Sequence, residues 1–79
     1  MATAVTNIVL ASDLVVGDRI AMPHVHKDGH PYVTVETVTE IIEVTNIDLE
    51  IHTTWKYKGQ TNFHASDYRV KFLDVFVKI

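Results

Sequence analysis

The chain has 79 residues, of which 47% are hydrophobic, and it carries a formal net charge of −3 and no cysteine. This length suits one domain with a modest core, so residues 1–79 are expected to form a single domain. The lack of cysteine excludes disulfides, thiolate metal sites and cysteine nucleophiles, and seven dispersed Lys and Arg residues disfavour nucleic acid as a partner. No apolar stretch is long enough for a signal peptide or a membrane span, which predicts a cytoplasmic protein without membrane contact.

The first part of the chain predicts two strands joined by a turn. Residues 5–10 have the apolar character of a strand, and the Ser-Asp pair at positions 12–13 is suited to cap a single helical turn. The Gly-Asp pair at positions 17–18 predicts a tight turn, because glycine adopts positive φ without strain. A second strand is expected to follow over residues 19–22.

The polar loop expected over residues 23–31 contains three of the five histidines. His24 and His26 point the same way on an extended segment, and imidazole is a good ligand for zinc, nickel or copper. A third ligand could come from His30, Asp28 or His52. The loop is therefore a candidate metal site. The alternatives are an exposed loop without metal, or a pH-sensitive surface, since protonating all five histidines would take the net charge from −3 to about +2.

The next segment predicts a long strand that bends. Val33 and Val35 lie in one phase of a period-2 pattern, whereas the following apolar residues lie in the opposite phase, namely Val38, Ile42 and Val44. A change of phase requires an extra residue or a bend. Residues 70–79 show the same change, and two bent strands favour a closed or partly open barrel over a flat sheet.

The clearest half-buried strand covers residues 47–55. Its apolar phase holds Ile47, Leu49, Ile51, Thr53 and Trp55, and its polar phase holds Asp48, Glu50, His52 and Thr54. Gly59 marks the next turn, and residues 61–65 alternate as a short strand. A polar turn at residues 66–67 and a closing strand are expected to follow.

Trp55 and Tyr57 lie at the end of the strand over residues 47–55, beside Lys56 and Lys58. Aromatic residues between cations stack on bases in single-stranded nucleic-acid binders, and aromatic residues also anchor protein interfaces. Alternatively, Trp55 plugs the end of the barrel, because it lies in the apolar phase. Since the chain is acidic overall, we rank protein contact ahead of nucleic acid.

The C-terminal segment over residues 72–79 is the most apolar part of the chain. Its expected core phase is Leu73, Val75, Val77 and Ile79. In that phase Phe76 points outward with Phe72 on the same face, and two exposed aromatic side chains form a patch typical of interfaces. A free strand edge here would recruit a second copy, so we expect a homodimer through this strand. The alternatives are a strand paired on both sides, or a bend that buries Phe72 in a monomer.

These patterns predict an all-β fold, a partly open barrel of five or six strands with at most one helical turn. Residues 13–20 read Asp-Leu-Val-Val-Gly-Asp-Arg-Ile. This segment resembles the Leu-x-x-Gly-Asp-x-Ile/Val segment that leads into the first long strand of many small SH3-like barrels, and residues 63–72 are similar to their ending. Such barrels occur among small accessory proteins of bacteriophages. The resemblance implies an SH3-like barrel whose partner is a host or viral protein.

The sequence contains no complete catalytic motif. Ser12-Asp13 and Ser66-Asp67, with the histidines, supply the residue types of a Ser-His-Asp site, but both pairs lie in segments typical of caps and turns. We therefore expect a non-enzymatic binding module without a cofactor. Its expected protein interface comprises Phe72, Phe76, Trp55 and Tyr57. A single-stranded nucleic-acid-binding barrel and a histidine-loop metal-binding protein are the alternatives.

Overall fold

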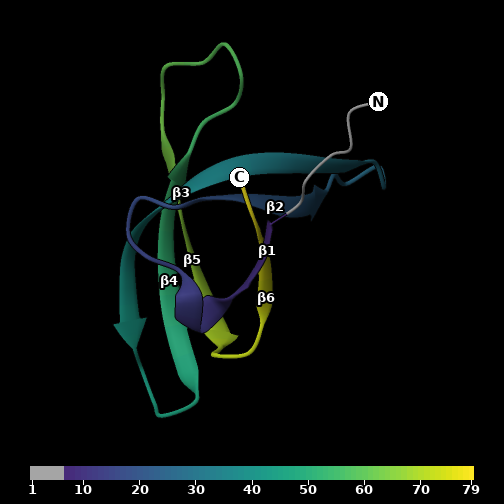
Figure 1. Cartoon of the computed structure of the whole chain (residues 1–79). Helices are drawn as coiled ribbons and strands as arrows, with labels where there is room; N and C mark the ends of the chain where they lie inside the picture. Colours follow the sequence, from purple (N-terminus) through teal and green to yellow (C-terminus); the bar gives the residue numbers. More distant parts are fainter. Residues whose placement is uncertain (1–6) are drawn as a thin grey trace, which may run out of the picture.

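A computed structural model describes residues 7–79 (Figure 1). Within this range six antiparallel strands form one open sheet in the order β1-β6-β2-β3-β4-β5, and the single helical element is a short 3₁₀ turn, η1. The elements are β1 (Asn7–Leu10), η1 (Ala11–Asp13), β2 (Arg19–Val25), β3 (Pro31–Glu43), β4 (Asp48–Trp55), β5 (His64–Lys71) and β6 (Val75–Lys78). The all-β fold with six strands and one helical turn, predicted from the sequence, is confirmed.

The long strand β3 connects the two halves of the sheet. Its first half pairs with β2 as far as Thr37, and its second half pairs with β4 from Thr37 to Glu43. The register shifts between Val38 and Glu40, because Thr39 is an extra residue on β3. Figure 1 shows β3 running first beside β2 and then turning to follow β4. The predicted bend is present, but not for the predicted reason. Val35 and Val38 face opposite sides of a regular stretch, and the bulge after Val38 turns Ile42 outward beside Glu50.

The core lies on one side of the sheet, which we call the inner side. Its buried hydrophobic members among the described residues are Ala11, Leu14, Ile20, Val38, Leu49, Ile51 and Phe76. In β4, Leu49, Ile51 and Thr53 are buried while the residues between them are more exposed, as the alternation predicted. Gly17 has a φ of +97° in the turn before β2, so the predicted turn is also present.

Several predicted boundaries are wrong. β2 continues through Pro23 and His24, where a loop was expected. Proline is tolerated here because β6 pairs with β2 only at Ile20 and Ala21, which leaves the far end of β2 as an edge. Continuous pairing with β4 places Ser66 within β5, not in a turn.

The predicted cap of the helical turn is also absent. The residue that precedes η1 is Leu10, which makes no capping side-chain hydrogen bond, and Ser12 and Asp13 lie inside the turn. The first residues of the strand predicted over 5–10 lie outside the described residues. Among residues 7–79, no helix has the length and apolar character needed to cross a membrane.

The facing predicted for the C-terminal strand is wrong. Phe76 is only 7% exposed and belongs to the core, whereas Val75 and Val77 point outward. The register explains this outcome, because Val77 pairs with Ala21, whose neighbour Ile20 is fully buried on the inner side. β6 pairs with β1 along its length and with β2 near its end. The C-terminal half of β6 is therefore paired on both edges.

Candidate functional site

The outer side of four neighbouring strands carries a continuous aliphatic surface. A row of paired residues crosses these strands from Ile8 to Val77, Ala21 and Val35, because paired residues of antiparallel strands share a face. We define the valine face as the six large aliphatic residues Ile8, Val25, Val33, Val35, Val75 and Val77. Their exposed fractions lie between 38% and 70%. A patch of this kind on a small protein indicates an interaction surface.

The outer side of β4 and β5 has the opposite character. Its paired positions bring Asp48 opposite Lys71 and Glu50 opposite Arg69. Opposite charges at facing positions stabilise a sheet and keep an edge strand from pairing with another chain. We call this surface the charged face, made of Glu40, Asp48, Glu50, His52, Asp67, Arg69 and Lys71. The outer side of the sheet is thus divided into an aliphatic half and a charged half.

His52 lies at the centre of the charged face. Its Nε2 lies 2.6 Å from a Glu50 oxygen, and its Nδ1 lies 2.9 Å from an Asp67 oxygen. The Glu50 hydrogen bond raises the pKa of His52, partial burial opposes this, and the charges of Asp67, Glu50 and Glu40 add to the increase. Because both ring nitrogens face carboxylates, the ring satisfies both contacts only when it is protonated.

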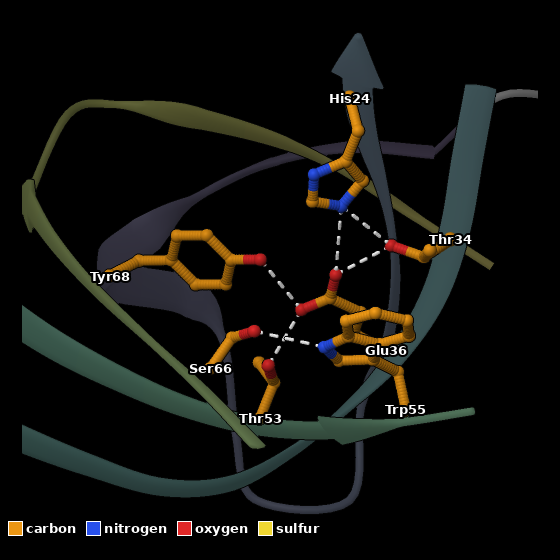
Figure 2. Close-up of polar contacts among 7 residues, drawn as sticks. All are labelled: His24, Thr34, Glu36, Thr53, Trp55, Ser66 and Tyr68. Atoms are coloured by element: carbon orange, nitrogen blue, oxygen red, sulfur yellow. Dashed lines mark hydrogen bonds and ion pairs between the residues drawn. The ribbon is translucent and has the colours of Figure 1, made fainter. Parts of the chain in front are cut away.

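A buried glutamate lies on the inner side of the strand that carries Val33 and Val35. Glu36 has no exposed surface and accepts hydrogen bonds from four side chains (Figure 2). Oε1 accepts from Thr53 at 2.6 Å and Tyr68 at 2.8 Å. Oε2 accepts from Thr34 at 2.6 Å and His24 at 3.2 Å. We call these five residues the Glu36 cluster.

The electrostatics of the Glu36 cluster favour a charged carboxylate. Burial raises the pKa of Glu36, but the four hydrogen bonds, with Thr34 the strongest, outweigh it and leave the pKa below its ordinary value. Burial, followed by the hydrogen bond to Glu36, raises the pKa of Tyr68 to about 12. Two donors on each oxygen occupy the acceptor positions of the carboxylate. Glu36 therefore positions its neighbours and is not free to bind a substrate or a metal.

The geometry fixes the tautomer of His24. Thr34 donates its hydroxyl proton to Glu36, so the Thr34 oxygen can only accept from His24 Nε2, 2.8 Å away. Both neighbours of Nε2 are acceptors, and Nε2 therefore carries a proton. Figure 2 shows this nitrogen directed at both oxygens.

The three histidines predicted as candidate metal ligands do not converge. His24 turns into the Glu36 cluster, His26 stacks on Tyr32 at 4.1 Å, and His30 pairs with Asp28 at 2.8 Å. No group of three or more His, Cys, Asp or Glu residues within the described range is arranged to hold a metal ion. The candidate site is not formed, because His24 Nε2 is engaged by Thr34 and Glu36 and the rings of His24 and His26 both stack on Tyr32.

The predicted aromatic site packs against itself at the end of β4. Trp55 donates from Nε1 to Ser66 at 2.9 Å, and its ring stacks on His64 with centroids 4.6 Å apart. Tyr57 contacts the Trp55 ring edge-on and is 41% exposed. One face of Trp55 is thus already occupied, as expected for a residue that packs the end of the sheet.

Phe72 lies between two hollows in the surface. One, of about 360 Å³, lies beside η1 and also contacts Leu14 and Leu49. The other, of about 410 Å³, lies beside the β3–β4 turn and also contacts Ile47 and Leu73. Phe72 is half-buried against the core and lines both hollows, so of the two aromatic residues predicted for a C-terminal interface, it alone reaches the surface.

Sequence reasoning missed the valine face and the Glu36 cluster. Both arise from the first half of β3, where Val33 and Val35 alternate with Thr34 and Glu36. The alternation itself signals a half-buried strand, but it does not say which phase lies inside. A usable signal was the pair of threonines Thr34 and Thr53, since each lies in the buried phase of its strand, Thr34 in β3 and Thr53 in β4.

The chain was compared with protein-family models, curated proteins and solved structures, and none of them matches it. We therefore infer its function from the geometry of the described residues.

Proposed function

We propose that this protein is a non-enzymatic binding module that acts through protein–protein contacts at the valine face. One observation carries the proposal: β3 points Val33 and Val35 outward and Glu36 inward. This arrangement reverses the usual distribution of charged and aliphatic residues. Burying a valine side chain fully stabilises a protein by about 1.5–3 kcal/mol, and the free chain forgoes much of this contribution. The exposed valines contribute this stabilisation when another protein covers the valine face.

The Glu36 cluster supports this function by fixing the register of β3. A slip of one residue would turn the valines inward and expose Glu36, and it would break all four hydrogen bonds to the carboxylate. The polar cluster therefore holds the valine face outward. The full occupancy of the Glu36 oxygens supports a non-enzymatic role, because the most buried acid of the described chain is not free to move a proton.

The resemblance of residues 13–20 to SH3-like barrels extends the proposal to a bacteriophage-type accessory protein in the host cytoplasm. A host or viral protein is the partner in that case. Only this short motif supports the extension, whereas the valine face supports the binding function independently.

Single-stranded nucleic acid is a second candidate ligand, favoured by the loop between β4 and β5. This loop exposes Tyr57 and Phe63, and Lys56 lies over the Phe63 ring at 5.3 Å. Binding to this loop would weaken as salt is added, because cations released from phosphates drive it. An electrophoretic mobility shift with labelled oligonucleotides at physiological salt tests this candidate, and Lys56→Glu should abolish the shift.

The proposed function is tested by photocrosslinking in the cell that naturally produces the protein. A photoreactive phenylalanine derivative at position 33 reports on the valine face, and the same derivative at position 42 is the matched control. Ile42 is also an exposed aliphatic residue of β3, but it lies beyond the bulge and outside the valine face. We expect protein adducts from position 33 and none from position 42. A position 33 without protein adducts would overturn the proposal.

A further inference from the structure

We infer that the partner that covers the valine face is a second copy of this chain, docked face to face about a two-fold axis. The inference rests on the proposed function and identifies its partner. It differs from the dimer predicted from the sequence, which joined strands edge to edge at the C-terminus. The valine face includes Val75 and Val77, so β6 contributes its outer face and not its edge.

The charge of the surface favours a second copy. The valine face and the residues paired with it, among them Leu10, Ala21 and Pro23, include no charged side chain. Arg19 borders the face on the side toward β4 and can remain in solvent. A partner with charges in its docking surface would have to bury them against aliphatic side chains, which is strongly unfavourable. A second copy presents an equally uncharged surface, while the groups of the charged face stay in water.

The shape of the surface also favours a second copy. Antiparallel sheets pack face to face about 10 Å apart with their strands nearly aligned, and aliphatic side chains fill the space between them. A two-fold axis makes the same patch serve both partners, so one contact covers both valine faces and closes the assembly. The seven buried hydrophobic residues of one described chain form a small core, and the dimer adds a second one.

The free edge of the sheet at β5 is not suited to the contact. β5 pairs with β4 on one side, and its outward residues include Asp67, Arg69 and Lys71. Charged side chains of this kind hinder the addition of another strand. The other edge strand, β1, has only four residues. Of these surfaces, the valine face is the one that offers a large uncharged contact.

The experiment measures the mass of the full chain by sedimentation over a range of micromolar concentrations. We expect a dimer for the unmodified protein. Val33→Lys places a charge within the contact and should raise the dissociation constant by about 30-fold or more. Val25→Lys, near the end of the β2–β3 hairpin, is the second variant. Both side chains are largely exposed in one copy, so both variants should keep the far-ultraviolet circular dichroism of the parent. Ile42→Lys, outside the face, should remain dimeric.

Three outcomes would overturn the inference. These are a monomer for the unmodified protein throughout the range, a dimer that both lysine variants leave intact, or a dimer that Ile42→Lys dissociates. The crosslinking experiment distinguishes failure of the dimer inference from failure of the proposed function. Adducts from position 33 to a different protein would retain a binding function at the valine face and remove the second copy as the partner.

Discussion

Glu36 connects four strands through one carboxylate. It projects from β3, and its donors come from β2, β3, β4 and β5, as Figure 2 shows. A buried acceptor with several donors is costly to remove, because each donor left without a partner destabilises the fold by about 1–3 kcal/mol. The free energy of unfolding of a domain this small is itself only on the order of 5 kcal/mol.

We predict that Glu36→Gln lowers the midpoint of thermal unfolding at pH 7 by ten degrees or more, since about 1 kcal/mol shifts the midpoint of such a domain by roughly 4–8 °C. The Gln amide directs an N–H₂ group at two side chains that donate to the carboxylate in the parent protein. Glu43→Gln, an exposed carboxylate at the end of β3, is the matched control and should change little. Calorimetry provides the measurement, and similar midpoints for the two variants would contradict the role of the cluster.

The depressed pKa of Glu36 also predicts an acid dependence. Stability from a carboxylate of this kind is fully present above its unfolded pKa and is lost as the pH falls through its lower folded pKa. The unfolding midpoint should therefore fall progressively as the pH drops below about 4.5, the ordinary pKa. Glu36→Gln should flatten this part of the profile.

His52 predicts the opposite dependence. Its pKa is raised, mainly by the Glu50 hydrogen bond, so its contribution is present below the ordinary pKa of 6.5 and is lost as the pH rises through the folded pKa. We expect the unfolding midpoint to decline above about pH 6.5, and His52→Gln to remove that decline. His30→Gln, in the exposed hairpin loop, is the control and should keep it. A ring proton titration by NMR that places His52 at or below 6.5 would contradict this assignment.

Among the elements, β4 and the β2–β3 hairpin differ most in their surroundings. β4 pairs with a strand on each side and contributes Leu49 and Ile51 to the core. The far part of the hairpin, residues 22–25 with residues 31–34, pairs only within itself. Amide protection follows local burial and pairing. We predict the slowest hydrogen exchange in β4 and clearly faster exchange in the far part of the hairpin. Equal protection of the two segments would show that the far part of the hairpin does not open independently of β4.

The sequence predicted correctly the strands in which a single alternating pattern shows which side chains face the core. In β4 the apolar phase is also the buried phase. A bend in β3 was predicted, but its position was not, because Val35 and Val38 lie on opposite sides of a regular stretch and the bulge follows Val38. The valine face was not predictable in the same way, because Val33 and Val35 look like core residues until pairing shows where they point. Phe76 was misplaced for the same reason, because the pairing of its neighbour Val77 with Ala21 decides which side of the sheet Phe76 faces. The extension of β2 past Pro23 was also not predictable, because it depends on β6 pairing with β2 only at Ile20 and Ala21, which leaves Pro23 on an edge.

At the scale of the whole molecule, the outer side of the sheet combines two surfaces with different roles. Face-to-face docking covers the aliphatic half and leaves the charged half in water, which favours one closed assembly over continued aggregation. The sequence contains both sets of residues but does not show the division, because strand order alone brings Ile8 at one end of the chain beside Val77 at the other. β1 and β6 meet only in the folded sheet.

Trp55 gives this molecule an optical reporter of its own. It is the only tryptophan of the chain, so all of the indole emission arises from one place, where the ring is stacked on His64 and hydrogen-bonded to Ser66. That place is on the inner side of the sheet, away from the surface where a second copy docks. Loss of the partner should leave the colour of the emission unchanged, whereas opening of the sheet should shift it to the red. Dissociation and unfolding can therefore be followed separately in the unlabelled protein.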